Sequence, residues 1–428
     1  MDKTYYKSIN ETIYHAVLEN GLNVYIIKKE GFTSKTAYFA TKFGSFNTGD
    51  IVNVDDKEYA LVGGLAHFLE HRVFDYKDGN IIDLYYKLGA DVNAYTSYDR
   101  TVYYFSTTDN FEECLKLLLD FPTSFTMSAE AVENEKDIIV NELLMYKDDP
   151  NDKLFKGLMS NLYNSHPVRY DVGGEPGEVR ETTRELLEVA HSTFYNPKNM
   201  YLVIVGDIDV EHTLEIVKQK QFKTIDASYT RKLIQEDNHV NTKYSEVYAD
   251  VNNEKLLIGY KFKPLDTLNE QDKSKIFLSF DLLTSILFYP SSEFYKKMIE
   301  DKYVSFISVD VMEYEGMFTM LIETDILKGK EVIINRIKEQ LDSALNLLTE
   351  EKLNNIKKKE ISSIIKGSDS CGGLAKNFMT FVLDDMNYCT LIDLVKSIDI
   401  KDIEKAYKEY YMGSEYSCCV LKGKENDK

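Results

Sequence analysis

The sequence is short of the features that mark several common classes of protein. It carries 51 Lys and Arg against 71 Asp and Glu, and this shortage of positive charge argues against a nucleic acid or an anionic membrane surface as a partner. No run of residues approaches the roughly 18 apolar residues of a membrane span. The five cysteines show no Cys-x-x-Cys spacing, which favours reduced thiols inside a cell. Residues 1–6 lack the apolar core of a signal peptide, so we expect a cytoplasmic location.

What the sequence does contain indicates a soluble, two-domain α+β protein. At 428 residues the chain is too long for one ordinary hydrophobic core. The pattern strand, helix, strand, strand, helix occurs in both halves, which predicts two similar domains, each a mainly antiparallel sheet packed with helices. We expect these domains at residues 1–222 and 246–428. A polar segment with little periodicity, at residues 223–245, is expected to link them.

Local signals place the main elements. Asn20-Gly21 predicts a hairpin between two strands within His15–Ile27, and Ser128 is the expected N-cap of a long helix that reaches about Lys147. Further strands are expected at residues 36–43, 91–97, 101–106, 200–205, 247–262, 304–312, 318–323 and 418–421. Further helices are expected after Gly63-Gly64 and at about residues 81–88, 111–121, 183–195, 272–288, 292–300, 329–348 and 350–366.

The chain has only seven histidines, and two of them lie four residues apart. His67 and His71 would project from the same face of a helix and could bind one ion. Glu70 directly precedes His71 and would be close enough to act on a water molecule bound to that ion. His-x-x-Glu-His is the inverted form of the commoner His-Glu-x-x-His motif of zinc hydrolases. No histidine follows His239, so the second half cannot carry a second copy of this site.

A catalytic zinc takes three protein ligands and leaves one position open. Glu135 and Glu142 lie seven residues apart on the expected long helix, which returns them to almost the same face. Ile138 and Ile139 between them indicate a largely buried helix, where two acids need a compensating charge. The alternative for this pair is a solvated row of acids, which is the interpretation we give to Glu133 and Asp137.

With these residues, the sequence resembles the pitrilysin/insulinase family of metallopeptidases, the inverzincins. The resemblance extends from about His15 to Asp207 and continues more weakly to the end of the chain. It includes Glu135-x6-Glu142, some seventy residues after the histidine motif, and the runs 93–97 (Asn-Ala-Tyr-Thr-Ser), 166–167 (His-Pro) and 195–200 (Tyr-Asn-Pro-Lys-Asn-Met). It implies that Glu142 is the third zinc ligand and that Glu135 supports a histidine by hydrogen bonding.

The resemblance also implies a mechanism. One Zn²⁺ per chain on His67, His71 and Glu142 would activate water, and Glu70 would act as the general base. The strand around Asn93 and Ala94 would be an edge strand that pairs with the backbone of a peptide substrate. From the residues alone, an interior strand is the alternative.

One segment departs from the family pattern. Active relatives place an Arg and a Tyr, seven residues apart, in the half without zinc to grip the substrate carbonyl, and Met298 and Ser305 take those positions here. Relatives of this length work as two-chain clamshells. We therefore expect a heterodimer with a related, zinc-less chain that supplies the Arg/Tyr pair, and otherwise a homodimer.

The function expected from the sequence is that of a zinc metalloendopeptidase that cleaves peptides or small proteins in an enclosed chamber. Two alternatives stay open. One is the zinc-bearing subunit of a heterodimer that removes the leader from a maturing peptide. The other is a non-catalytic assembly subunit, against which the complete set His67, Glu70, His71 and Glu142 argues.

Overall fold

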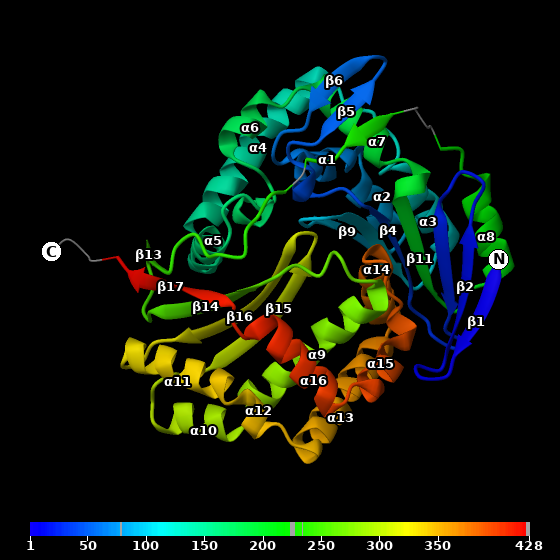
Figure 1. Cartoon of the computed structure of the whole chain (residues 1–428). Coiled ribbons are helices and arrows are strands. Elements are labelled where there is room, and N and C mark those ends of the chain that lie inside the picture. Colours follow the sequence, from blue (N-terminus) through cyan, green and yellow to red (C-terminus); the bar gives the residue numbers. More distant parts are fainter. Residues whose placement is uncertain (78, 223–226, 233, 425–428) are drawn as a thin grey trace. The chain divides into compact units, whose positions relative to one another are not determined.

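The computed structural model describes residues 1–77, 79–222, 227–232 and 234–424. The chain forms two compact units, each assembled from several segments of the sequence. Unit 1 comprises Met1–Leu143, Tyr170–Leu233 and Ile364–Ile392; unit 2 comprises Leu144–Arg169, Ile234–Ser363 and Asp393–Lys428. Each unit holds a mainly antiparallel sheet packed with helices (Figure 1), so the α+β class expected from the sequence is confirmed.

A seven-stranded sheet in the order β1-β2-β3-β11-β4-β10-β9 is the frame of unit 1. Neighbouring strands are antiparallel except β3 and β11, which are parallel. Asn20-Gly21 turns the chain between β2 and β3, so the predicted hairpin is confirmed. The strands are β1 (Asp2–Tyr6), β2 (Glu11–Val17), β3 (Asn23–Lys28), β4 (Lys35–Thr41), β9 (Ala90–Thr96), β10 (Thr101–Thr107) and β11 (Met200–Gly206).

The central strands β4 and β11 are apolar on both faces because both faces of the sheet are covered. Phe39 and Leu202 face the main core, whereas Tyr38 and Val203, next to them along the strands, face the opposite side. Helix α14 (Cys371–Leu383) packs against β4 and β11. A helix from late in the sequence thus completes unit 1.

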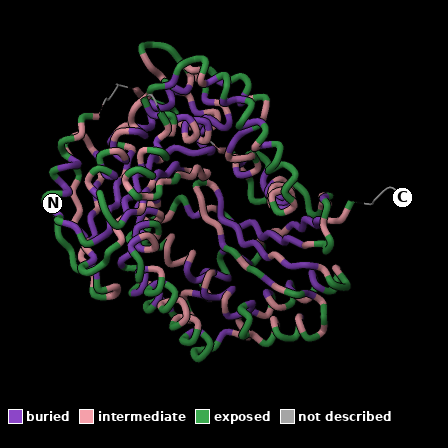
Figure 2. Tube along the Cα trace, turned by 180° about the vertical axis from the view of Figure 1, so that it is seen from behind, coloured by how far each residue is buried: buried purple, intermediate pink, exposed green. Residues whose placement is uncertain are grey.

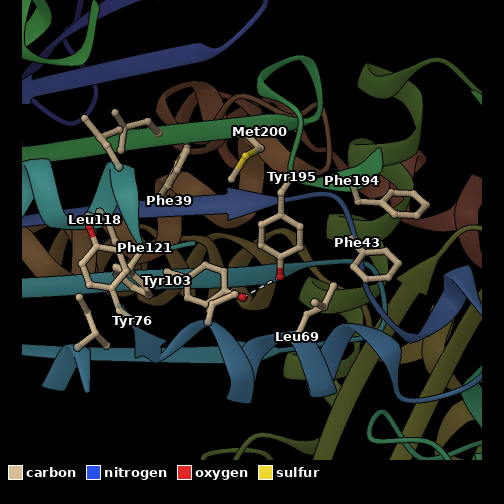
Figure 3. Close-up of a cluster of buried hydrophobic side chains, with 14 of the residues drawn as sticks. Phe39, Phe43, Leu69, Tyr76, Tyr103, Leu118, Phe121, Phe194, Tyr195 and Met200 are labelled. Carbon is tan, nitrogen blue, oxygen red and sulfur yellow. Dashed lines mark hydrogen bonds between the residues drawn. The ribbon is translucent and has the colours of Figure 1, made fainter. Parts of the chain in front are cut away.

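The main core of unit 1 holds the histidine-bearing helix in place. Tyr103 and Tyr195 are buried at its centre and share a hydrogen bond of 2.7 Å between their hydroxyls (Figure 3). Leu69 of helix α1 (Leu65–Val73) points into the same cluster. Burial of one such leucine contributes about 1.5–3 kcal/mol, so α1 is fixed by its apolar face.

Helices and two small sheets surround this frame. The helices are α2 (Ile81–Lys87), α3 (Phe111–Asp120), α4 (Ala129–Asp148, which continues five residues past the end of this segment of unit 1), α6 (Pro176–Glu181), α7 (Arg184–Phe194) and α8 (Val210–Gln219). The small sheets are β12-β5-β6, of Ser228–Thr230, Ile51–Val54 and Lys57–Ala60, and the pair β7-β8, of Asp75–Tyr76 and Gly79–Asn80.

Part of the expected linker at 223–245 is strand. Strand β12 pairs with β5, and the buried carboxylate of Asp50 accepts a hydrogen bond of 2.8 Å from the backbone N–H of Lys232. Residues 223–226 and 233 of the expected linker lie outside the described residues. The boundaries at 222 and 246 stay a prediction.

Unit 2 is built on a five-stranded sheet in the order β13-β17-β14-β16-β15, antiparallel except for the parallel pair β13 and β17. Buried residues follow its three central strands, β17, β14 and β16 (Figure 2). The strands are β13 (Tyr244–Ala249), β14 (Lys255–Phe262), β15 (Ile307–Tyr314), β16 (Met317–Asp325) and β17 (Glu415–Gly423). The helices are α5 (Pro150–Leu162), α9 (Glu270–Phe288), α10 (Glu293–Glu300), α11 (Lys330–Asp342), α12 (Ala344–Leu347), α13 (Glu350–Ser368, whose last residues belong to unit 1), α15 (Leu391–Ser397) and α16 (Ile400–Ala406).

Most expected elements are present, with two differences in the second half. The stretch 247–262, expected as one strand, is the two strands β13 and β14, and the helix expected at 329–348 breaks into α11 and α12. All five cysteines are free and buried. In the described part of the chain, no helix combines the length and the apolar character needed to cross a membrane.

Candidate metal centre

Helix α1 presents the histidine motif. Gly64 caps its N-terminus in the left-handed conformation, with a φ of 80°. The helix buries its apolar side, and its 3.6-residue period leaves His67, Glu70 and His71 half-buried on the other side. The rings of His67 and His71 lie 4.6 Å apart between centroids. The spacing of four residues therefore brings the two imidazoles together, as the sequence predicts.

Helix α4 presents the two glutamates. Ser128 accepts a hydrogen bond of 3.1 Å from the N–H of Ala131, in the manner of a helix N-cap. Glu135 is buried and Glu142 is half-buried. The expectation that Ile138 is buried with Ile139 is wrong, because Ile138 is 57% exposed. The buried side of α4 carries Glu135, Ile139 and Val140, whereas Ile138 falls on the exposed side of the helix.

The structure brings together a donor set that suits zinc. One ligand atom each from His67, His71 and Glu142 can be chosen so that all three lie within 4.8 Å of one another. Glu142 Oε2 lies 3.2 Å from His71 Nε2, and Glu142 Oε1 lies 3.9 Å from His67 Nε2. Ligands about 2.0–2.1 Å from a tetrahedral zinc are separated by about 3.3–3.4 Å. Two imidazoles and one carboxylate at these separations therefore fit a zinc ion.

Glu135 lies behind the imidazole of His71, away from the three ligand atoms. Its Oε1 is 3.0 Å from His71 Nδ1, and its Oε2 accepts a hydrogen bond of 2.7 Å from Arg72. Burial alone would raise the pKa of Glu135, but the hydrogen bonds from His71 and Arg72 outweigh it and lower that pKa. Arg72, which also pairs with Asp75, compensates the buried charge. The role of Arg72 was not predicted from the sequence, although its place next to His71 is a signal for it.

The two imidazoles differ in their surroundings. Burial, with the nearby His71 as the next cause, lowers the pKa of His67 to about 4. Burial also acts to lower the pKa of His71, but Glu135 and Glu142 outweigh it and the pKa of His71 is raised. The Nδ1 atom of His67 is buried and has no hydrogen-bond partner among the described residues. A neutral His67 is in the protonation state that a metal ligand needs.

Glu70 is not one of the three grouped residues and is held by a neighbour. The hydroxyl of Thr96 on β9 donates a hydrogen bond of 2.5 Å to Glu70 Oε2. Burial raises the pKa of Glu70, and the hydrogen bond from Thr96 offsets part of this rise. Thr96 lies within the family-like run 93–97, but the sequence analysis assigned it no role.

Asn93 and Ala94 lie on an edge strand. Strand β9 pairs with β10 on one side and is the last strand of the seven-stranded sheet. Asn93 is exposed and its side chain accepts a hydrogen bond of 2.8 Å from the N–H of Ala94. The alternative of an interior strand is therefore wrong. No described strand pairs with the other edge of β9, so an extended peptide could pair along it.

Met298 and Ser305, at the positions expected for the Arg/Tyr pair, lie in unit 2. Met298 is 1% exposed in α10. Ser305 donates hydrogen bonds to Asp325 through its backbone N–H (2.6 Å) and its hydroxyl (2.5 Å). A buried thioether and a hydroxyl already bound to a carboxylate are poorly suited to grip a substrate carbonyl.

Two pairs of glycines bring a turn against the start of α1. A Cβ atom on Gly64 would lie 2.1 Å from the carbonyl oxygen of Gly173, and a Cβ on Gly174 would lie 2.5 Å from the carbonyl carbon of Gly63. Gly64 and Gly174 both have a left-handed φ, of 80° and 78°. Glycine is needed at these positions for both the conformation and the close approach.

The α+β fold and the inverted motif on α1 define the class, a protein built like a zinc peptidase from two insulinase-type domains. The family model Insulinase (Peptidase family M16) matches residues 55–175, and Peptidase M16 inactive domain matches residues 181–360. This chain belongs to the insulinase family, peptidase family M16.

Relatives span the whole chain. The uncharacterized zinc protease YmfH of Bacillus subtilis (strain 168) is 33% identical over 421 residues, which cover 97% of this chain and 98% of that protein. The zinc protease PqqE of Helicobacter pylori is 22% identical over 423 residues, 93% of this chain and 94% of that protein. The crystal structure of an M16-like peptidase from Alicyclobacillus acidocaldarius is similar with a TM-score of 0.89 and 25% identity, over 97% of this chain and 99% of that one.

The glycine contacts predict that Gly64→Ala destabilises the protein. Alanine in the left-handed conformation costs about 1 kcal/mol, and the overlap with the Gly173 carbonyl adds to it, so we expect a loss of about 2 kcal/mol or more. Thermal unfolding of the metal-free chain measures this loss of stability. Gly177→Ala, at a helical glycine whose added Cβ would meet nothing within 4 Å, is the matched control. Equal unfolding temperatures for the two variants would contradict the close approach.

Proposed function

We propose that this chain is a zinc-dependent endopeptidase with one zinc bound by His67, His71 and Glu142. The observation that carries the proposal is the convergence of these three ligand atoms beside Glu70, an acid whose pKa is raised by burial. The names of the relatives, zinc proteases, support it. When bound, zinc would lower the pKa of water and polarise a peptide carbonyl.

The residues of the chain would divide the remaining chemistry. Glu70 would take the proton of the attacking water and deliver it to the leaving nitrogen. Thr96, which donates to one oxygen of Glu70, would keep the other oxygen free for this transfer. Glu135 would orient His71 through Nδ1. Strand β9 would align the peptide backbone, with Asn93 and Ala94 nearest the bond that is cut.

Two alternatives differ in specific ways. A leader-processing subunit would use the same residues on one peptide substrate, cleaved beside a biosynthetic enzyme. A non-catalytic assembly subunit has no use for Glu70 or for the hydrogen bond that Thr96 donates to it. The presence of both residues favours catalysis. The enclosed chamber and the cytoplasmic location belong to the proposal as well.

We propose that catalysis also needs a related, zinc-less chain, with a homodimer as the alternative. The burial of Met298 and the bonds of Ser305 to Asp325 support this, because neither side chain can act as the missing donor. An Arg/Tyr pair from the partner would stabilise the developing oxyanion.

The first prediction concerns Glu70→Gln. With the partner chain present, loss of the base should lower kcat for cleavage of a mixed peptide pool by about 10²–10⁴, while the zinc content stays at one ion per chain. Glu133→Gln, at an exposed acid of α4, should leave both unchanged. Cleavage that survives Glu70→Gln would show that the activity comes from elsewhere.

The second prediction concerns the hydroxyl of Thr96. Thr96→Val removes the donor at nearly constant volume, so the Glu70 carboxylate loses its orientation. We expect kcat to fall about 10-fold or more with little change in KM, because an interaction that orients the base acts on the chemical step. Thr96→Ser keeps a hydroxyl and should restore most of the rate. Equal rates for Val and Ser would assign Thr96 a packing role instead.

The third prediction concerns the partner chain. The purified, zinc-loaded chain alone should be silent on the peptide pool, and a related zinc-less chain with an Arg/Tyr pair should restore cleavage. Light scattering should show a 1:1 complex. Cleavage by the chain alone that Glu70→Gln abolishes would contradict the need for a second chain and support self-sufficiency or a homodimer.

A further inference from the structure

His67 and His71 are supported unequally. The Nε2 atoms of both rings face Glu142, so a metal bound there leaves each Nδ1 to carry the proton. Glu135 lies against Nδ1 of His71. Nδ1 of His67 is buried and lacks a hydrogen-bond partner among the described residues. A histidine that binds a metal almost always donates its second N–H to a carboxylate, a carbonyl or water.

The turn that the glycine pairs hold against α1 carries a carboxylate on this side of the ring. Asp171 Oδ1 accepts a hydrogen bond of 2.8 Å from the N–H of Gly173, which folds the side chain back over the turn. The point where a Cβ of Gly173 would stand is 3.2 Å from His67 Nδ1 and 3.4 Å from Asp171 Oδ1. The imidazole nitrogen and the carboxylate oxygen therefore both lie close to the position where a side chain of residue 173 would begin.

The other two acids whose charges act on His67 lie at other atoms of the two rings. Glu142 faces Nε2, on the opposite edge of the ring. Glu135 is bound to His71 and Arg72. The third carboxylate whose charge acts on His67 is that of Asp171, and it shares the neighbourhood of Gly173 with Nδ1.

We propose that Asp171 is the positioning residue of His67, as Glu135 is of His71, and that it accepts the Nδ1 proton of His67 directly or through one water when the ring binds the metal. This inference rests on the proposed metal centre. It also gives a reason for Gly173, because a Cβ there would crowd Nδ1 of His67 and Asp171 Oδ1 and would press on Leu143, next to Glu142.

The experiment measures zinc affinity of the full chain by competition with a chromophoric chelator. Asp171→Ala should weaken zinc binding by about 10- to 100-fold, the range found when such supporting acids are removed. Asp171→Asn, which keeps an acceptor but loses the charge, should fall between Asp171→Ala and the wild type. Glu181→Gln, at an exposed acid ten residues further on, is the control and should bind within about twofold of the wild type.

A second readout separates positioning from folding. The unfolding temperature of the metal-free variants shows whether the turn survives, and the absorption spectrum of the Co²⁺-loaded chain reports the geometry of the ligands. We expect Asp171→Asn to keep the unfolding temperature and to change both the zinc affinity and the Co²⁺ spectrum. If Asp171→Ala unfolds at a lower temperature than the wild type, the zinc affinity of Asp171→Asn alone tests the role of Asp171.

The outcomes are distinct. Zinc affinity of Asp171→Asn and of any folded Asp171→Ala within twofold of the wild type would overturn the role of Asp171 and leave the metal centre standing. A wild-type chain that binds zinc no better than His67→Ala would instead overturn the proposed centre, and this inference with it.

Discussion

The arrangement of the site depends on two contacts that helix α4 makes with the imidazole of His71, one at each ring nitrogen. Glu135 meets His71 at Nδ1 (3.0 Å) and Glu142 meets it at Nε2 (3.2 Å). The two acids are seven residues apart, so they lie on one face of the helix about 10 Å apart along its axis. Long side chains from two turns can therefore converge on the two nitrogens of one ring. The same spacing gives the two glutamates different chemistry, since only Nε2 faces the ligand group.

These contacts with His71 require that α1 and α4 both be held in place by residues outside the site. Leu69 anchors α1 in the core of unit 1, and Ile139 anchors α4. Arg72 then joins them electrostatically, because it brings a positive charge to Glu135. Strand β9 belongs to the same sheet as the buried β4 and β11, so Thr96 reaches Glu70 from a rigid frame. Rigid support of this kind is what a preorganised site needs.

The sequence predicted the parts of the site that have a fixed period. The i, i+4 spacing of the histidines and the seven-residue spacing of the glutamates are local, and helical geometry converts them directly into shared faces. Thr96, Arg72 and Asp171 could not be predicted in the same way, because their partners are fixed by tertiary packing. The same holds for α14, whose place on the sheet of unit 1 depends on contacts far apart in the sequence. The predicted burial of Ile138 was wrong for a related reason, because two adjacent apolar residues do not show which of them faces the core.

The charge balance explains why a cation suits this site. Half-buried carboxylates in proteins ordinarily face a lysine or an arginine. Among the described residues, the ion-pair partners of Glu142 are the two imidazoles, and one of them, His67, has a pKa of about 4 and is neutral. Glu70 is held by a neutral hydroxyl. Arg72 is committed to Glu135 and Asp75 on the far side of His71. His71, whose pKa is raised, is the cation that the described chain sets against Glu142. A metal ion at Nε2 of the two rings would take the place of its proton and bring more positive charge to Glu142 and Glu70.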